Sequence, residues 1–454
     1  MLKRLGVLLL VVTLILSFNV CVFAEELIED KILTEQELLN IIPDTYMDLT
    51  DQSAKLSRGA FCAMLVKAAE MELIEFKEDE DLPSDVDRDS WYANQVFTLY
   101  KHDILRGIED GSIYPERPIT GIEACSLVGR ALGVPEIVSS SSGVNGIHEK
   151  HWAYDLLSWL IEDELFDADL KLFENISAEE AAKFLVKAFG KDEDAEAIIQ
   201  KANELNQDIR AMRLKGQMKI KVNFIQPQEG MEALELKADS FSEISKDLKI
   251  YQNTKAQISG LEESITMEQY MDEDYIYMFM QLEQQEPQWV KIKNPVGKVL
   301  NEEFLSKQKE LLEGYEDPIC YKLMGKQKID GKECYKLIFY YGQKDGTDVL
   351  EMLSSMGIQQ EELLNQVSDM IEHMSMRGTI YIDAESYEVI KAENTAVLTQ
   401  NDKNQPDETQ IIDSMVMETS FEYYDYDADI KIEIPSDALN AKEINLAESS
   451  DSLE

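Results

Sequence analysis

The chain is poor in the residues that most often carry metal binding and covalent catalysis. Its 454 residues include five cysteines and four histidines, although these two residue types supply most zinc ligands in proteins. His148 and His151 have the spacing of a metal-binding pair. No third ligand accompanies them in the sequence, so a polar loop is the better interpretation.

Positive charge is also scarce. Lysine and arginine number 43 against 89 aspartates and glutamates, which gives a formal net charge of −46. A field of this sign repels nucleic acid and anionic lipid surfaces, so we expect no nucleic-acid partner. It permits divalent cations, basic partners or neutral ligands, although a well-solvated surface is the explanation of the charge that we favour.

Long apolar runs are absent except at the N-terminus. There Lys3 and Arg4 precede an apolar run that ends at Val22-Phe23-Ala24, which fits the small-residue rule for signal-peptidase cleavage. We therefore predict that residues 1–24 form a signal peptide. An uncleaved membrane anchor is the alternative, because the run approaches the ~20 residues that a membrane span needs. Cys21 lacks the small preceding residues of a lipobox, so we do not expect it to carry a lipid.

Catalytic motifs are missing as well. The sequence contains no Gly-x-Ser-x-Gly, phosphate loop, dinucleotide fingerprint or Cys-His nucleophile setting. The run from Asp85 to Asp89 imitates the start of a calcium loop, but its sixth position is not glycine and its twelfth, Val96, is not glutamate. We expect no cofactor, no metal and no enzymatic activity. The alternative is an extracellular hydrolase or metal-dependent enzyme carried by the second half of the chain.

The most informative feature that is present is the stretch from Ile104 to Glu123, because a similar pattern of residues occurs both before and after it. Its residues predict a helix exit at Gly107 and a tight turn at Asp110-Gly111, because glycine adopts the left-handed dihedrals that such turns need. Thr120 then caps a second helix, with Glu123 three residues further on, which is the spacing of a capping box.

These similar patterns set a period of about 60 residues. Trp91 and Trp152 each open an amphipathic run, and Ser57, Thr120 and Ser177 each precede a helical pattern. After these caps the helices align without gaps. The equivalent positions are Met64, Leu127 and Phe184; Leu65, Val128 and Leu185; Ala68, Ala131 and Ala188; and the polar set Lys67, Arg130 and Lys187. Such a period indicates stacked supersecondary units that bury their apolar faces against each other.

This repeat resembles the S-layer homology (SLH) module. The residues that carry the resemblance are Asp85-Val86 before Trp91, then Gly107, Asp110-Gly111, Pro115 and the run from Ile119 through Thr120 to Glu123. The resemblance covers roughly Asp30 to Gly190, and the first repeat keeps little beyond its second helix. It implies an all-α, pseudo-threefold domain over residues 25–192 that binds secondary cell-wall polymer, often a pyruvylated glycan. In this pattern Asp85 is a structural turn residue.

The resemblance also nominates polymer-binding residues. In the family, the arginine of Thr-Arg-Ala-Glu contacts the polymer, and here only Arg58 keeps that position, because Gly121 and Ala178 occupy the other two. The candidates are Arg58, Trp91, Trp152, Lys67, Arg130 and Lys187. Arg58 is explained equally well as a surface charge, and the two tryptophans as core anchors of the repeat. Either one groove suffices for binding, or the module serves as a scaffold or protein-contact surface.

Cys62 and Cys125 occupy equivalent positions in the repeat. A disulfide across the pseudo-symmetry axis is one interpretation. The other, which we favour, is that both are small apolar residues in tight helix contacts.

Cys320 and Cys334 flank a predicted hairpin with its turn at Asp330-Gly331. A two-residue turn places Gln327 opposite Cys334. Cys320 is then an odd number of residues from Gln327 and points to the other face of the sheet. We therefore expect free thiols.

The second half changes character after a charged segment at residues 191–196, where we place the domain boundary. A charged helical pattern extends from residue 192 to about 213, followed by a period of two that indicates antiparallel strands with one wet and one dry face. The predicted strands lie at residues 218–224, 234–236, 248–251, 256–258, 275–277, 289–292, 379–383, 388–391, 411–424 and 431–435. Two helical insertions are predicted at 302–314 and 348–374, and an acidic flexible tail at 441–454.

This order of elements resembles the LolA/LppX-like lipoprotein superfamily, and more narrowly an uncharacterised group of Gram-positive lipoproteins. The matching pieces are Tyr275-Ile276-Tyr277, Trp289-Val290-Lys291, the hairpin at 329–332 and the ending from Tyr424 to Pro435. The resemblance implies a curved sheet around helices over residues 193–440, able to enclose an apolar cavity for acyl chains. The methionine-rich insertion at 348–374 fits a lipid-binding surface, or simply the filling of the concave core.

The sequence therefore predicts an α+β fold of two domains: an all-α pseudo-threefold SLH domain, then a curved antiparallel β half-barrel with packed helices. The function it predicts is that of a non-catalytic, secreted protein of a Gram-positive-type cell wall. Its partners would be secondary cell-wall polymer and, for the second domain, a lipid or other hydrophobic small molecule.

Overall fold

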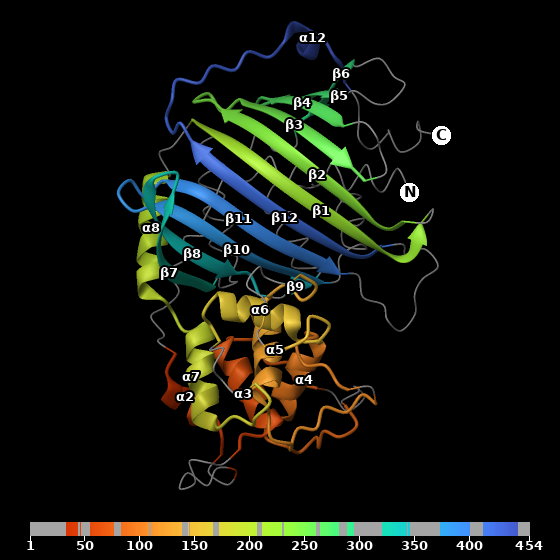
Figure 1. Cartoon of the computed structure of the whole chain (residues 1–454), viewed down its shortest axis with the longest axis vertical. Coiled ribbons are helices and arrows are strands. Elements are labelled where there is room, and N and C mark those ends of the chain that lie inside the picture. Colours follow the sequence, from red (N-terminus) through yellow and green to blue (C-terminus); the bar gives the residue numbers. More distant parts are fainter. Residues whose placement is uncertain are drawn as a thin grey trace.

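The computed structural model describes residues 33–43, 46, 55–76, 83–108, 110–138, 144, 146–166, 172–206, 211–228, 231–259, 264–280, 288–294, 320–342, 344–345, 373–399 and 412–443. A helical unit is followed by a large curved sheet, so the predicted α+β fold class is confirmed (Figure 1). The predicted signal peptide, the insertion at 302–314 and nearly all of that at 348–374 lie outside the described residues.

Six helices build the first unit, and they pack in pairs. Their bounds are α2 Glu35–Leu39, α3 Arg58–Ala68, α4 Ala93–Lys101, α5 Gly121–Leu132, α6 Tyr154–Glu162 and α7 Ala178–Phe189 in the described residues. Helix α3 packs against α4, α5 against α6, and α7 against α2. The short helix α2 therefore closes a cycle of three helix pairs.

A ring of three backbone hydrogen bonds lies where these pairs meet. The N–H of Ile119 donates to the carbonyl of Leu56 at 2.9 Å, that of Ile176 to Ile119 at 3.1 Å, and that of Leu56 to Ile176 at 3.2 Å. Each of these residues directly precedes the residue that caps α3, α5 or α7. The ring closes on itself and matches the predicted pseudo-threefold arrangement.

The helix starts repeat at the level of side chains and dihedral angles. Thr120 and Glu123 form a capping box, and Ser177 with Glu180 forms another, as their spacing predicts. The residues before α4 and α6, Tyr92 and Ala153, have nearly identical backbone angles, with φ near −100° in both. The repeat indicated by Trp91 and Trp152 in the sequence therefore appears again in the backbone conformation at the starts of α4 and α6.

The turn after α4 is built from the residues that the repeat pattern singles out. The Asp85 carboxylate accepts hydrogen bonds from the backbone N–H groups of Ile113 at 3.1 Å and Tyr114 at 2.6 Å. A Cβ at Gly107 would lie 2.8 Å from the backbone of Gly111, which itself has a φ of +79°. Asp85 therefore ties a turn together through two backbone donors.

In the described residues, thirteen strands form one sheet in the order β13-β6-β5-β4-β3-β2-β1-β12-β11-β10-β8-β7, with β9 beside β10. Neighbouring strands are antiparallel except β13 and β6. The bounds are β1 Met212–Gln228, β2 Met231–Ile244, β3 Ile250–Ile258, β4 Ile265–Met271, β5 Tyr275–Met280, β6 Gln288–Lys293, β7 Cys320–Ile329, β8 Lys332–Tyr340, β9 Lys344–Asp345, β10 His373–Asp383, β11 Val389–Thr399, β12 Ile412–Tyr424 and β13 Lys442–Glu443. Helix α8 (Glu193–Asn206) precedes the sheet, and α12 (Ser436–Leu439) lies near its end.

Several predicted boundaries are wrong. Helix α8 ends at Asn206 and Met212 already belongs to β1, so the helical pattern does not reach residue 213. Residues 373–374 begin β10 rather than ending a helix, because His373 and Met374 pair with β11. The sequence does not predict strand β4, because its alternation of apolar and polar residues extends over only seven residues.

Two predictions near the C-terminus also fail. Residues 431–435 are not a strand; Ile430 and Ile432 are buried against Ala211 without a ladder partner, so the alternation records burial alone. Lys442 and Glu443 form β13 rather than the start of a flexible tail, because they pair with β6. Contacts with residues distant in sequence decided both cases: burial against Ala211 in the first and pairing with β6 in the second.

The two faces of the sheet differ in chemistry. We call the face that carries Leu214, Met218, Ile220 and Val222 the inner face, and the face that carries Lys215, Gln217, Lys219 and Lys221 the outer face; the register extends both faces across the sheet. Helix α8 packs on the inner face through four small or apolar residues, namely Ala195, Ile198, Ile199 and Ala202.

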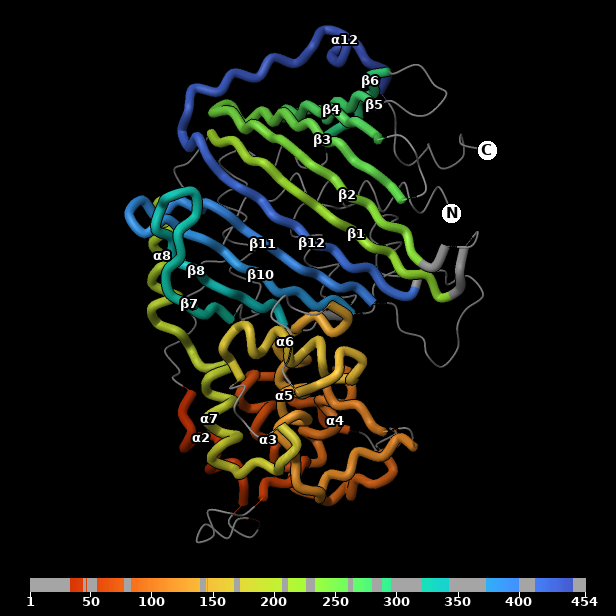
Figure 2. The backbone as a smooth tube through the Cα atoms, in the orientation of Figure 1, coloured from red at the N-terminus to blue at the C-terminus, as the bar shows by residue number. Residues whose placement is uncertain are grey.

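The helical unit docks against the outer face beside β8 and β10, where α6 lies below the sheet (Figure 2). Ile338 and Tyr340 of β8 are part of the core of the helical unit. Asp163, which follows α6 and is 0% exposed, pairs with Arg377 of β10, which is 7% exposed. Burial alone would lower the pKa of the Arg377 guanidinium, but the hydrogen bonds and charge of Asp163 outweigh it and raise the pKa.

Candidate functional site

The start of α3 lies against the start of α4, and this contact contains Arg58. A Cβ at Gly59 would lie 2.9 Å from the Tyr92 ring, so only glycine allows the two helices to approach this closely. The Arg58 backbone N–H donates to the Arg117 carbonyl at 2.9 Å, and the Arg58 side chain is 11% exposed. We call this contact the first inter-repeat groove.

Three buried polar atoms at the starts of α3 and α4 lack hydrogen-bond partners. They are Arg58 Nε, Trp91 Nε1 and Gln95 Oε1, and they are the complete set of such side-chain atoms in the described residues. Trp91 lies in the turn directly before the N-cap of α4, and Gln95 lies in the first turn of that helix. An unpaired buried polar group costs about 1–3 kcal/mol. Their occurrence on these two neighbouring helix starts makes this part of the helical unit a candidate place for a ligand to supply the missing partners.

A carboxylate positions the Arg58 guanidinium. Glu123 Oε1 lies 3.6 Å from Arg58 Nη1 and also accepts a hydrogen bond from Arg117 Nη2. Burial would raise the pKa of Glu123, but hydrogen bonds from Arg117 and the Thr120 backbone, together with the Arg58 charge, outweigh it and lower the pKa. Glu123 is therefore an anion that both caps α5 and orients Arg58.

Aromatic rings form the wall beside these atoms. The Trp91 ring lies 5.5 Å from that of Tyr92 and 5.8 Å from that of Tyr46, measured between centroids. The Tyr92 hydroxyl donates to Glu116, and burial together with this carboxylate raises the pKa of Tyr92 to about 12. The Tyr92 hydroxyl is therefore neutral at physiological pH.

The second inter-repeat groove, between the starts of α5 and α6, is different. Gly121 stands where the first groove has Arg58, and Trp152 is 57% exposed, with its ring 5.4 Å from that of His151. The interpretation of both tryptophans as core anchors is therefore wrong for Trp152 and holds only for Trp91, which packs against the core. Trp152 lacks the tyrosine neighbours that cover Trp91 in the described structure.

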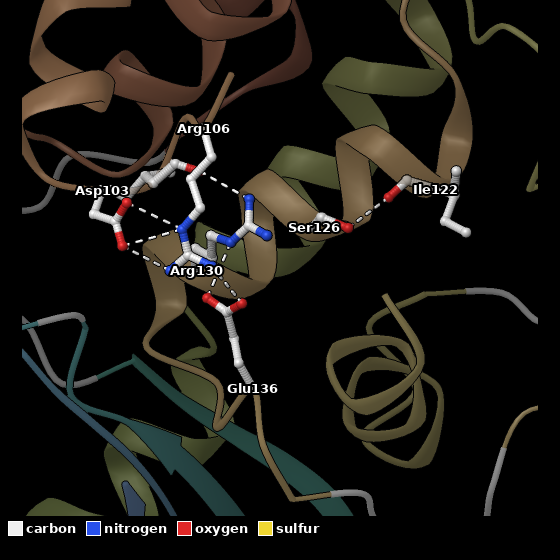
Figure 3. Close-up of polar contacts among 7 residues, drawn as sticks. Asp103, Arg106, Ile122, Ser126, Arg130 and Glu136 are labelled. Atoms are coloured by element: carbon white, nitrogen blue, oxygen red, sulfur yellow. Dashed lines mark hydrogen bonds and ion pairs between the residues drawn. The ribbon is translucent and has the colours of Figure 1, made fainter. Parts of the chain in front are cut away.

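The three equivalent cations have different environments. Lys67 is half-buried and Lys187 is exposed. Arg130 is 9% exposed, and its Nε donates to Glu136 at 3.0 Å while its Nη1 donates to the Ile104 carbonyl at 3.2 Å (Figure 3). Burial lowers the pKa of Arg130, and Glu136 opposes the effect.

Arg130 is therefore enclosed within the helical unit, where its guanidinium bonds to Glu136 and the Ile104 carbonyl. Glu136 also accepts from Arg106 at 2.8 Å, and Arg106 pairs with Asp103, so four charges form one internal network (Figure 3). The sequence alignment alone could not reveal this, because Glu136 and Asp103 lie outside the aligned helices.

The four cysteines in the described residues are free. Cys62 and Cys125 are buried thiols without a disulfide, and burial raises the pKa of Cys62 to about 12. Cys320 and Cys334 are also free, and the register places Gln327 opposite Cys334 as predicted. None of these thiols has the lowered pKa of a nucleophile.

The histidine pair has local structural roles. The Nδ1 of His148 accepts from the Lys150 N–H at 3.1 Å, and that of His151 accepts from the Ala153 N–H at 3.3 Å. Within the described ranges, no group of three or more His, Cys, Asp or Glu residues is arranged to hold a metal ion. No helix in those same ranges is long and apolar enough to cross a bilayer.

The inner face of the sheet is the second candidate surface. The register assigns the inner-face positions of the strands that lie between β5 and β8 in the sheet. Among the described residues outside the strand bulges, none of these positions carries a charged side chain. Its methionines are Met212, Met218, Met267, Met271, Met278, Met374, Met376, Met415 and Met417. This composition is what an adaptable apolar surface requires.

One end of the inner face is polar but uncharged. Ser242, Gln252, Thr254 and Gln269 of β2 to β4 are buried there, and the register places Gln252 directly opposite both Ser242 and Gln269. The inner face thus combines an apolar zone with a neighbouring row of amides and hydroxyls, which is the pattern expected for an amphiphile with an uncharged polar head.

Of the residues that line the first inter-repeat groove, the sequence nominated Arg58 and Trp91 but missed Gln95, Tyr92 and Arg117. Arg117 offered no signal in the sequence, because its role depends on the turn that brings it to Glu123.

Comparison with known families gave two matches. The model of a family of unknown function, DUF6612, matches residues 194–443, and that of the S-layer homology domain matches residues 84–125. A comparison with curated proteins gave no match.

Solved structures similar to the chain include mycobacterial lipoproteins. LprF from Mycobacterium bovis is 11% identical with a TM-score of 0.29, and the match covers 54% of this chain and 98% of LprF. Lipoprotein LppX from Mycobacterium tuberculosis is 10% identical with a TM-score of 0.28, covering 54% and 100%. A putative outer membrane lipoprotein-sorting protein domain from Vibrio parahaemolyticus is 9% identical with a TM-score of 0.18, covering 53% and 94%. Neighbours of the expected superfamily are thus found, but at TM-scores too low to establish a ligand.

Proposed function

The chain belongs to the family of unknown function DUF6612 and contains an S-layer homology domain, and on this basis we propose that it is a non-catalytic, exported cell-envelope protein. Its helical unit, residues 25–192, attaches to secondary cell-wall polymer. Its sheet domain, residues 193–440, binds a lipid or another hydrophobic molecule at the surface of a Gram-positive-type cell.

The cluster of unpaired polar atoms in the first inter-repeat groove is the observation that carries the anchoring role. Arg58 offers a planar guanidinium, which suits a carboxylate or phosphate of a wall polymer. Trp91 Nε1 is a second donor and Gln95 Oε1 is an acceptor. These atoms match a ligand that bears both an anionic group and hydroxyls.

One occupied groove is enough for this role. The guanidinium attracts the anionic group locally, against the long-range field of a chain with net charge −46. Binding should therefore strengthen at moderate salt, where the long-range repulsion is screened while the short contact persists, and weaken only at high salt.

Co-sedimentation of the full chain with purified cell walls tests the anchor. We expect Arg58→Ala to lower wall retention at least 10-fold, while Lys183→Ala, an exposed cation of α7, retains wild-type binding. Loss of binding in both variants, or in neither, contradicts the assignment.

Trp91→Phe gives a sharper version of the same test, because it removes one unpaired N–H and keeps the ring. We expect weaker wall binding together with unchanged or increased thermal stability, since the buried donor is unsatisfied in the free protein. A purely structural Trp91 would leave wall binding unchanged.

The uncharged inner face supports the hydrophobic-ligand role. Titration of the delipidated full chain with a fluorescent fatty acid is expected to show saturable binding. Met417→Asp introduces a charge on the inner face and should abolish it, whereas Glu418→Ala, the next residue on the outer face, should not. Absence of saturable binding by the wild-type chain would remove the lipid part of the proposal and leave the anchor untouched.

A further inference from the structure

A polar groove lies on the outer face of the sheet where α6 meets it. It consists of a hollow of about 580 Å³ that continues into a second of about 460 Å³. The two hollows share Gln217, Asp239 and Ser420, from β1, β2 and β12. We call the two together the junction groove; its volume falls in the range of small-molecule sites.

The deep end of the groove is built from buried side chains. Arg377 is 7% exposed, and its guanidinium carbon lies 4.4 Å from the centre of the Trp159 ring. The Nε and Nη2 groups of Arg377 donate hydrogen bonds to the carboxylate of Asp163. The Nη1 group of Arg377 donates to Thr379 Oγ1 at 3.3 Å. Because a guanidinium has five N–H donors, Arg377 keeps donor capacity at a position that packing holds rigid.

The rim carries both signs of charge. The register places Lys219 opposite Lys237, and like charges in this position are unfavourable. Lys219 is compensated by Glu418 at 2.9 Å, and Asp239 accepts a hydrogen bond from Gln217 at 3.1 Å. Lys237 is exposed and has no ion pair in the described structure.

The charges of the larger hollow balance. Four cations and four carboxylates line it: Lys219, Lys237, Lys336 and Arg377 against Glu162, Asp239, Glu393 and Glu418. A lining of this kind has no preference for a net charge of either sign. The surrounding field of a chain with net charge −46 disfavours an anion. An uncharged ligand avoids that cost and needs no excess charge of either sign in the lining.

The groove also offers uncharged donors and acceptors beside its charged groups. Amide and hydroxyl groups from Gln217, Thr379 and Ser420 alternate with ammonium and carboxylate groups. A sugar hydroxyl both donates and accepts, so a saccharide satisfies such a lining without bringing charge. An apolar molecule would displace water from the exposed polar groups of this lining without replacing its hydrogen bonds, at about 1–3 kcal/mol for each group left without a partner.

We propose that the junction groove binds an uncharged saccharide segment. The choice of a saccharide rests on the proposed envelope function; the position of the site rests on the groove alone. A glycan at the cell surface is then held in two places, by its anionic groups at Arg58 and by neutral sugar units in the junction groove. The buried pair of Asp163 and Arg377 joins the helical unit to the sheet beside the junction groove.

Calorimetric titration of the full chain with three tetrasaccharides tests the proposal. The probes are chitotetraose, which is uncharged, its de-N-acetylated form, which is cationic, and a hyaluronan tetrasaccharide, which is anionic. We expect chitotetraose to bind at least 5-fold more tightly than either charged probe. Equal or weaker binding of chitotetraose overturns the choice of an uncharged ligand.

Substitutions in the chain test whether chitotetraose binds in the junction groove. Ser420→Trp fills the point shared by the two hollows and should abolish chitotetraose binding, and Lys237→Ala should weaken it several-fold. Lys221→Ala is the matched control, because Lys221 is exposed on the same face of β1 but lies outside the groove. Unchanged melting temperatures show that the variants fold.

The Arg58→Ala variant separates this proposal from the anchor. It should bind chitotetraose like the wild type, even where it no longer sediments with cell walls. If Arg58→Ala loses chitotetraose and Ser420→Trp keeps it, the junction groove is not the saccharide site, whereas the anchoring role stands. If wall binding fails but the groove variants behave as expected, only the anchor is overturned.

Discussion

At the scale of single residues, one carboxylate connects helix capping to the candidate polymer site. Glu123 receives hydrogen bonds from the backbone and hydroxyl of Thr120 and from Arg117, and lies within ion-pair distance of Arg58. A charge held by this many partners contributes to stability only while it is ionised.

This makes a prediction about pH. The pKa of Glu123 is lower in the folded protein than its unfolded value of roughly 4.3. Its contribution is therefore complete above that value and is lost as pH falls through the lowered folded pKa. Glu123→Gln should cost about 1–3 kcal/mol at pH 7, and the difference from wild type should shrink steadily below about pH 4. Urea unfolding at several pH values measures it; a difference independent of pH would contradict it.

At the scale of elements, the close approach of neighbouring strands limits which residues the sheet accepts. Gly378 of β10 lies opposite Phe339 of β8 in the register. A Cβ at Gly378 would lie 2.0 Å from the tip of the Phe339 ring. The ring therefore occupies the space of the missing side chain, as aromatic residues often do beside glycine in sheets.

Gly378→Ala should destabilise the protein by about 1–3 kcal/mol, because the ring must leave its position in a packed core. The double variant Gly378→Ala/Phe339→Leu should recover part of that loss relative to Phe339→Leu alone, since leucine leaves room for the methyl group. Chemical denaturation of the four proteins in this cycle measures the coupling. Simple additivity of the two changes would refute the steric explanation.

At the scale of the whole molecule, a buried ion pair joins the two halves. Asp163 follows the last residue of α6, where the helix dipole disfavours an anion, yet its carboxylate is fully buried against Arg377 and Tyr340. Burial and the neighbouring carboxylate raise the pKa of Tyr340, which keeps its hydroxyl protonated as a donor. The junction is consequently a specific contact rather than a flexible link.

Arg377→Met should destabilise the chain by about 3–5 kcal/mol, because it leaves the Asp163 carboxylate buried without its cation. The double variant Arg377→Met/Asp163→Asn should be clearly more stable than Arg377→Met. Lys326→Met is the control, since its pair with Glu333 is exposed and worth at most about 1 kcal/mol. Equal effects of Arg377→Met and Lys326→Met on the unfolding free energy would show that the junction contributes no more than a surface pair.

The same junction bears on how much of the site could be predicted. Periodicity revealed the repeats, their caps and the inner face of the sheet, because these depend on neighbours within a few residues or within one repeat. It could not reveal that Arg130 is enclosed by Glu136, or that Trp152 is exposed while Trp91 is covered, because the residues responsible lie outside the aligned helices.

What the sequence determined by itself is local and periodic: helix starts at Ser57, Thr120 and Ser177, the turn at Asp330-Gly331 with Cys334 opposite Gln327, and the uncharged face of the strands. Only the tertiary structure decided that α2 closes the helical cycle, that β4 and β13 join the sheet, and that Asp163 meets Arg377. The physical reason is that hydrophobic periodicity and capping act over a few residues, whereas ladder pairing and buried ion pairs depend on partners that the chain brings together only when it folds.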